Sequence, residues 1–281
     1  MILNELCFTT LKGQAKIMSE ANIKQINMQQ WIKIVFTVCL FSEVTLVALD
    51  YIFNYMDVFG DKQFRRIWNI ARENSIPTWF SSIQAQLLGV TVLLIAAVQK
   101  RHISAFKTWG WILIGLFFLF IGIDDFAAIH EKLGGVLQRM AEKGDSSEGA
   151  VVGLLLQNPS FSWHTFIAPI FALCGLAIAL FLWVEFWKLN LFRYLFWGFG
   201  CWIVAQSLDF VEGLDEVDTY YGLVQDYFAI ERAYLVSHTF KVVEEFLEML
   251  GTTLLWVGFL SYFAHVADGL KFKLVGSDNL K

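Results

Sequence analysis

The chain has few charged residues and few cysteines, and both shortages restrict the kind of protein it can be. Only 17% of its 281 residues are charged, 57% are hydrophobic, and the mean hydropathy is +0.54. Soluble domains carry about 25% charged residues, so a water-soluble enzyme is excluded. The formal net charge of -5 offers no basic surface for a run of phosphates, and we expect no nucleic-acid partner. The four cysteines form no CxxC pair, which argues against a disulfide framework or a thiolate metal site.

The short motifs of common enzyme classes are also missing from the sequence. It contains no HExxH, GxSxG, GxGxxG or P-loop pattern, so the usual hydrolase and nucleotide-binding signatures do not apply. No signal-peptide-like apolar segment precedes the first long apolar run, and we expect that run to stay in the mature protein. Residues 1–17 resemble a dispensable polar tail, so either Met1 or Met18 can be the start.

Long apolar runs are abundant instead. Runs of about 20 apolar residues, the length that crosses a hydrocarbon core of ~30 Å, predict transmembrane helices. The strands of a β-barrel would be alternating segments of about ten residues, which are absent. The predicted fold class is therefore all-α, a polytopic transmembrane helical bundle with about six spans in a lipid bilayer. The predicted spans are 31–53, 79–99, 108–127, 163–186, 191–211 and 245–267.

The spans make one transmembrane domain, 31–267, between an N-terminal tail, 1–30, and a C-terminal tail, 268–281. With the N-terminus inside, the inner segments hold 11 Lys and Arg residues, and the longer outer segments hold eight. The positive-inside rule then places both tails in the cytoplasm. Among the outer segments, 54–78 mixes apolar and charged residues and predicts an interfacial helix, while 132–162 is rich in Gly and Ser and predicts a mobile loop.

Ionisable residues in or beside the spans are costly in lipid, and we treat them as functional candidates. With six alternating helices they gather at one membrane face, where we expect a polar cavity lined by spans 1, 3, 5 and 6. Residues three, four and seven apart share a helix face. In the last span this spacing places several polar side chains in one stripe along the helix. It also predicts that Glu244 points away from this stripe. The stripe contains His238, Lys241, Glu245 and Glu248.

Two further stripes lie at the same depth, Asp124 with Glu131 in the third span and Asp209, Glu212 and Glu216 in the fifth. Together the three stripes of carboxylates and imidazole predict a centre that binds a divalent metal, namely zinc, iron or manganese. Such ligands suit these metals, and helical bundles build centres of this kind from inward-facing Glu and His. Carboxylates left unpaired at this depth would repel one another, so a cation supplies the missing positive charge. The predicted metal ligands are Asp124, Glu131, His238, Glu245 and Glu248.

The string Ile123-Asp124-Asp125-Phe126-Ala127-Ala128-Ile129-His130-Glu131 is a DExxxxHE-like element at the end of a span. A regular helix through it cannot present Asp124, Asp125, His130 and Glu131 to one centre. Together with 72–82 and the EExLEMLG-like segment 244–251, it resembles a group of uncharacterised multi-pass bacterial membrane proteins. The resemblance implies a bacterial inner (plasma) membrane and no particular activity. It supports one site that contains Glu73, His130, Glu131, Glu245 and Glu248.

Three functions remain open at this stage. The first is a metal-dependent enzyme that acts on a lipid or amphipathic small molecule, with Glu73, His130 and Glu212 as its catalytic residues. The second is a proton- or cation-coupled transporter. Its proton pathway would use Glu43, Asp50 and Lys241. The third is a non-catalytic structural subunit of a membrane complex. We prefer the first, because the ionisable groups gather at head-group depth and do not continue to the opposite face.

Overall fold

The protein is an all-helical bundle in the computed structural model, which describes residues 28–100, 102–143, 160–161, 163–214, 216–230 and 232–267. Within these ranges there are ten helices and no strand. The long ones are α2 (Met28–Asp50), which continues into the π-helix η1 (Tyr51–Tyr55), α4 (Ile76–Gln99), α5 (Ala105–Ala127), α8 (Trp163–Trp187), α9 (Phe192–Glu212) and α11 (Ala233–Val266). The short ones are α3 (Lys62–Trp68), α6 (Ile129–Lys143) and α10 (Val217–Phe228).

Five of the long helices, α2 with η1, α4, α5, α8 and α11, are long and apolar enough to cross a membrane. The sixth, α9, has 21 residues, so at about 1.5 Å per residue it also matches the thickness of a bilayer. It carries the polar Gln206 and Asp209, both of which bond to side chains of α11. The predicted fold class is confirmed, and the chain is a multi-pass membrane protein.

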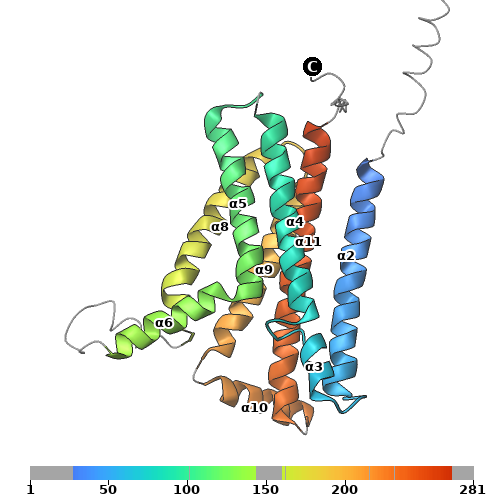
Figure 1. Cartoon of the computed structure of the whole chain (residues 1–281), viewed down its shortest axis with the longest axis vertical. Coiled ribbons are helices and arrows are strands. Elements are labelled where there is room, and N and C mark those ends of the chain that lie inside the picture. Colours follow the sequence, from blue (N-terminus) through green and yellow to red (C-terminus); the bar gives the residue numbers. More distant parts are fainter. Residues whose placement is uncertain are drawn as a thin grey trace, which may run out of the picture.

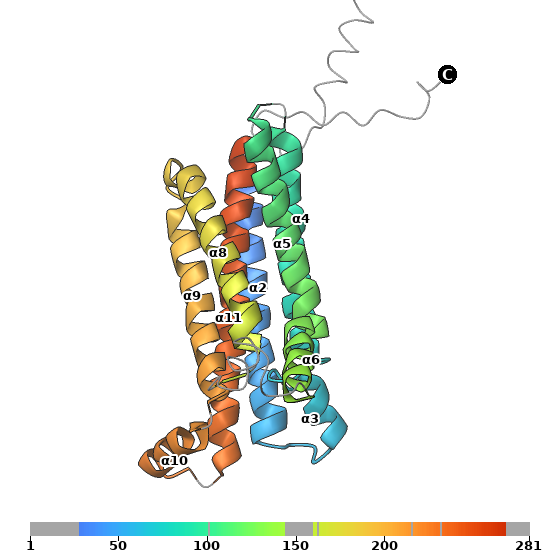
Figure 2. The same ribbon diagram turned by 90° about the vertical axis from the view of Figure 1, so that its left-hand side faces the viewer.

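The long helices run alongside one another (Figure 1). The longest, α11, is central, because it contacts α9 on one side and α2 and α4 on the other. Figure 2 shows α8 and α9 on one side of α11 and the pair α4 and α5 on the opposite side. Since both flanks of α11 are covered, its side chains face two different sets of neighbours.

Glycines allow the closest helix pairs to approach. A Cβ atom on Gly251 of α11 would lie 2.8 Å from the carbonyl oxygen of Gly198 on α9, and one on Gly89 of α4 would lie 2.8 Å from that of Gly115 on α5. Small residues at such crossings let the backbones of membrane helices pack tightly. The close crossing of α9 and α11 brings the polar ends of these two helices together.

The short helices α3, α6 and α10 lie at one end of the bundle (Figure 1). Residues 62–68 of the segment where we expected an interfacial helix form α3. Residues 132–143, where we expected the start of a mobile loop, belong instead to α6, whose amphipathic sequence continues the helix. The remainder of that segment, 144–159 and 162, and most of both predicted tails lie outside the described residues.

The other end of the bundle has an aromatic core. Trp111, Phe186 and Phe259 are fully buried there, and Tyr262 packs its ring parallel to that of Phe186 with the centroids 5.1 Å apart. Lys107 and Glu185 form the ion pair of this end, at 2.6 Å. Apolar packing therefore fixes this end of the helices.

Candidate functional site

A cavity of about 530 Å³ opens at the end of the bundle that carries α3, α6 and α10. Its walls come from the segment before α4 and the start of that helix, from the α5–α6 junction, and from α8, α9 and α11. We expected the first span among its walls, but no residue of α2 lines it. Eight carboxyl groups line the cavity, against the two cations Arg72 and Lys241. The carboxyl groups belong to Glu73, Asp125, Glu131, Asp209, Glu212, Glu244, Glu245 and Glu248.

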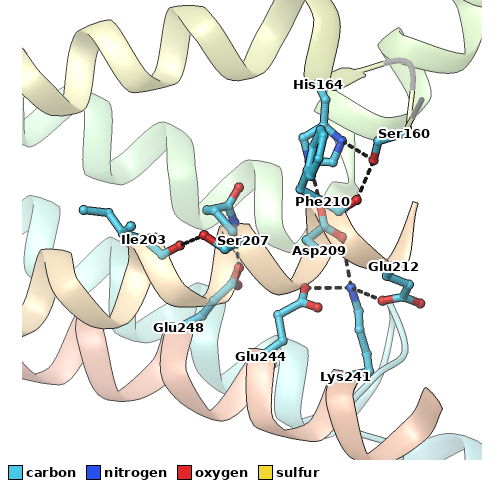
Figure 3. A network of polar contacts seen from close by, with 11 residues as sticks. Ser160, His164, Ile203, Ser207, Asp209, Phe210, Glu212, Lys241, Glu244 and Glu248 are labelled. Carbon is cyan, nitrogen blue, oxygen red and sulfur yellow. Dashed lines mark hydrogen bonds and ion pairs between the residues drawn. The ribbon is translucent and has the colours of Figure 1, made fainter. Parts of the chain in front are cut away.

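Lys241 of α11 is the centre of the most compact part of this cavity. Its Nζ lies 2.7 Å from Glu244 Oε1, 3.3 Å from Asp209 Oδ1 and 3.4 Å from Glu212 Oε2 (Figure 3). Asp209 and Glu212 are one turn apart near the end of α9, so the crossing of α9 and α11 brings the three carboxylates to one ammonium group. Oxygen atoms of these three carboxylates lie within 4.8 Å of one another, close enough to share a metal ion.

The position of Glu244 corrects the expectation that it points away from the site. The Glu244 side chain is buried and forms the shortest of the three lysine contacts. The expectation assumed that α11 has one functional face, whereas α11 is covered on two flanks and uses the face toward α9 for Lys241, Glu244 and Glu248.

His164, at the start of α8, extends this cluster on the far side of Asp209. Its Nε2 lies 3.3 Å from Asp209 Oδ2, and its Nδ1 lies 3.3 Å from Ser160 Oγ, which donates a hydrogen bond to the carbonyl oxygen of Phe210. The side chain of His164 is only 8% exposed. Its Nε2 is within ion-pairing distance of Asp209 but makes no hydrogen bond to any described residue. This nitrogen faces Asp209, and His164 itself does not belong to the residues that line the cavity.

His130 lines another wall of the cavity and is held by Asp124. Helix α5 ends at Ala127, Ala128 adopts a left-handed backbone conformation with φ 45°, and α6 starts at Ile129. The turn folds His130 back on Asp124, so that its Nδ1 lies 2.7 Å from Asp124 Oδ2 and its backbone N–H donates to Asp124 Oδ1 at 2.9 Å. Because the helix breaks here, Asp125, His130 and Glu131 all reach the cavity, while Asp124 stands behind His130.

Charge around His130 changes the affinity of its imidazole for a proton. Burial lowers the pKa of His130, but the hydrogen bond to Asp124 and the negative charges of Asp124, Glu131 and Asp209 outweigh burial, and the pKa is raised above its ordinary value. The pKa of Glu131 is also raised, by desolvation at the cavity wall and by the neighbouring Glu73 carboxyl group. Both groups on this wall therefore hold a proton more tightly than the same groups do in water.

Two of the remaining carboxyl groups of the cavity accept hydrogen bonds from uncharged side chains, and a third lies near a lysine at the limit of ion-pairing distance. Gln206 of α9 donates from Nε2 to Glu248 Oε1 at 2.9 Å, and Ser81 of α4 donates to Asp125. Glu73 lies 3.8 Å from the exposed Lys132. Glu245 lines the cavity near Glu248 and has no ion-pair partner among the described residues. The cavity as a whole thus has eight acidic side chains and two cationic ones among the described residues.

His238, a predicted metal ligand, lies away from the cavity on the side of α11 that faces α2. Its Nε2 lies 2.8 Å from Asp50 Oδ2, and both side chains are buried. Asp50 also accepts hydrogen bonds from Asn54 Nδ2 at 2.9 Å and from the backbone N–H of Ile70 at 3.0 Å. This pair is fully bonded and connects η1, α11 and the segment after α3.

The structure thus distributes the five predicted metal ligands over three places. Glu131, Glu245 and Glu248 line the cavity, Asp124 orients His130, and His238 pairs with Asp50. The predicted catalytic residues Glu73, His130 and Glu212 all line the cavity. Of the predicted proton pathway, Lys241 lies in the cavity, Asp50 lies with His238, and Glu43 is buried between α2, α4 and α11. The group that can share a metal is Asp209, Glu212 and Glu244.

Comparison with known proteins identifies a family and no activity. No curated protein and no solved structure matches the chain. A family model described as a domain of unknown function (DUF8692) matches residues 34–263, which include four of the six long helices whole, most of α2 and α11, and every residue that lines the cavity. The chain therefore belongs to the DUF8692 family of proteins of unknown function.

Proposed function

We propose that this protein is a membrane-embedded, metal-dependent enzyme that hydrolyses a lipid or another amphipathic small molecule at one face of the bilayer. The observation that carries the proposal is the combination of two features in one cavity. One is the group of three carboxylates from α9 and α11 that can share a cation. The other is an imidazole, that of His130, held in place by a carboxylate, that of Asp124. Together these are the parts that metal-assisted hydrolysis needs.

The metal in this proposal is zinc, iron or manganese, bound by Asp209, Glu212 and Glu244. His164 Nε2, buried and 3.3 Å from Asp209, adds a nitrogen ligand of the kind these metals accept. Lys241 contacts the same three carboxylates, so the metal and the ammonium group compete for them. The long lysine side chain is a fifth exposed and can withdraw toward the cavity when a divalent ion, with twice its charge, binds.

His130 supplies the proton chemistry. A bound metal would acidify a coordinated water. Asp124 fixes Nδ1 of His130, which leaves Nε2 as the nitrogen that can take a proton from that water. With a metal bound, His130 would hold the proton of that water while the water oxygen attacks the carbonyl carbon or phosphorus of the substrate, and it would return the proton to the departing alcohol as the ester bond breaks. Glu73 and Glu131 line the same space and would orient the water and the leaving group, while Glu212 would hold the metal.

The cavity fits the head of an amphipathic substrate. Its volume of about 530 Å³ lies within the range of small-molecule sites, about 300–1,000 Å³. Phe161 and Trp163 line the cavity and give its wall apolar surface for an acyl chain. In our proposal this end of the bundle faces the outer side of a bacterial inner membrane and both termini are cytoplasmic, as the distribution of Lys and Arg favours.

The test is the conversion of lipids by purified protein in mixed detergent micelles. A bacterial total lipid extract is incubated with the protein and with zinc, iron or manganese, and products are identified by mass spectrometry. We expect a metal-dependent product that His130→Asn abolishes and that Lys107→Met, at the opposite end of the bundle, leaves unchanged. The proposal is wrong if no metal yields a product, or if His130→Asn retains the full rate.

A second function, a proton-coupled cation transporter, is favoured by one observation, the burial of Glu43 inside the membrane part of the bundle. A carboxyl group at that depth is typical of proton relays in transporters. Protein reconstituted in vesicles with a pH-sensitive dye inside separates the two functions. A transporter moves protons when manganese is added outside and Glu43→Gln abolishes this movement, whereas an enzyme moves none.

A further inference from the structure

Glu43 is a buried carboxyl group in the middle of a transmembrane segment. It lies 15 residues after Met28 and 12 residues before Tyr55 in the span made by α2 and η1, and its exposed fraction is 0%. At about 1.5 Å per residue it is far from both ends of the helix. An ionised carboxylate at such a position is expensive unless a positive charge compensates it.

No such positive charge is present around Glu43. Among the described residues, no Lys, Arg or His lies within ion-pairing distance of it. The titratable groups that interact with it are two thiols, Cys39 on α2 and Cys201 on α9. Its neighbours on α4 and α11 are the uncharged Gln84 and Thr253.

Only one of the two carboxyl oxygens of Glu43 accepts hydrogen bonds from described residues. Oε1 accepts from Gln84 Nε2 at 2.9 Å and from Thr253 Oγ1 at 2.5 Å. The other carboxyl oxygen, Oε2, and the amide oxygen of Gln84 are both buried and have no partner among the described residues. Both unpartnered atoms are oxygens that accept hydrogen bonds and cannot donate them. A hydrogen bond between them therefore needs a proton on one of the two. A proton on Oε2 makes it a donor, and the Gln84 oxygen is the free acceptor of the same pair.

Glu43 and its hydrogen-bond partners Gln84 and Thr253 lie deeper in the bundle than the cavity, and two helices connect them to it. On α4, Gln84 is three residues after Ser81, which bonds to the cavity residue Asp125. On α11, Thr253 follows Thr252, whose hydroxyl bonds to the carbonyl oxygen of the cavity residue Glu248. Ser81 and Gln84 are three residues apart on α4, or about 4.5 Å, and Glu248 and Thr253 are five residues apart on α11, or about 7.5 Å. On these two helices, therefore, Glu43's partners lie within two turns of residues of the acidic cavity.

We propose that Glu43, with Gln84 and Thr253, is a proton-binding site inside the bundle. Glu43 is a neutral carboxylic acid that shares its proton with Gln84, and this proton exchanges with the acidic cavity, whose residues lie within two turns of Gln84 and Thr253. This site requires neither a bound metal nor the enzyme reaction, because the burial and the hydrogen bonds of Glu43 define it.

Infrared spectroscopy of the purified full-length protein at neutral pH tests the site directly. We expect a carbonyl band of a protonated carboxylic acid in the wild type that is missing from Glu43→Gln and kept in Glu185→Gln, the matched control at the other end of the bundle. Since glutamine resembles a neutral glutamic acid in shape and charge, Glu43→Gln should leave the melting temperature almost unchanged. An unaltered band in Glu43→Gln, or a large drop in its melting temperature, would overturn the assignment.

Transfer of the same sample to D2O tests the exchange. We expect the Glu43 band to shift as fast as the cavity carboxyl groups exchange, because the proton has a short route to the cavity. If the band keeps its position while amide protons of α6 exchange, Glu43 holds its proton in a sealed site, and the exchange part of the proposal is wrong.

Discussion

The two ends of the helical bundle are held together by different forces. At one end Trp111, Phe186 and Phe259 are fully buried, and a single ion pair joins Lys107 to Glu185. At the other end eight carboxyl groups surround a cavity, and Lys241 is the cation that joins α9 to α11 there. Aromatic packing dominates the first end, whereas the acidic end carries more acidic side chains than cationic ones and offers carboxyl groups to a bound cation. Loss of one side chain should therefore lower stability regardless of metal at the aromatic end, and in a way that added metal reverses at the acidic end.

The largest expected effect is at the aromatic end. Phe259→Ala removes a ring that contacts Trp111, Phe118 and Phe186 in edge-on arrangements. Truncation of a buried Phe costs about 3–5 kcal/mol. We expect this loss of unfolding free energy, measured by denaturation in detergent, to be the same with and without zinc or manganese. A loss that metal reverses would mean that the two ends are not independent.

Lys241→Met should have a smaller effect that depends on metal. It leaves Asp209, Glu212 and Glu244 without their shared ammonium group, and loss of one partner of a buried pair costs about 3 kcal/mol. Because a divalent ion can replace the ammonium group, added zinc or manganese should restore most of the stability in the same assay. Lys107→Met, whose side chain is 43% exposed, is the matched control and should change stability by less than about 1 kcal/mol. A loss that neither metal restores would remove the support for competition between Lys241 and a metal.

The pair of His130 and Asp124 should give the smallest and most pH-dependent effect. Its hydrogen bond and charges raise the pKa of His130 above the ordinary value of about 6.5. A raised pKa in the folded state stabilises the protein fully below the ordinary pKa, and this contribution is lost as the pH rises through the raised one. We expect the melting temperature of the wild type to exceed that of His130→Asn at acid pH, with the gap closing at alkaline pH. A gap that is constant with pH would contradict the account of this pair.

The sequence predicts the helices and the end of the bundle where the site lies, because both depend on one-dimensional patterns. Runs of apolar residues predict the six long helices, and alternation of helix direction places the acidic residues at one end. Lys241, Glu245 and Glu248 were expected on one face of α11, and all three line the cavity. These features follow from hydropathy and helical periodicity alone.

The partners of individual side chains could not be predicted in the same way. Whether His238 faces α9 or α2 depends on how α11 is rotated between its neighbours, and the spacing of residues does not contain that rotation. The left-handed residue Ala128 breaks a string that periodicity treats as one helix, and this break brings His130 onto Asp124. Alanine favours helix, so no local signal marks the break. His164 and Asp209 come from helices whose contact only the three-dimensional structure gives.

Binding of a divalent metal by Asp209, Glu212 and Glu244 is tested most directly by the metal content of the protein. Protein purified without chelators is dialysed against zinc, iron or manganese and examined by elemental analysis, together with Glu244→Gln and the control Glu185→Gln. The account predicts about one equivalent of one metal in the wild type and the control, and far less in Glu244→Gln. Equal metal content in the wild type and Glu244→Gln, or almost none in the wild type, would contradict it.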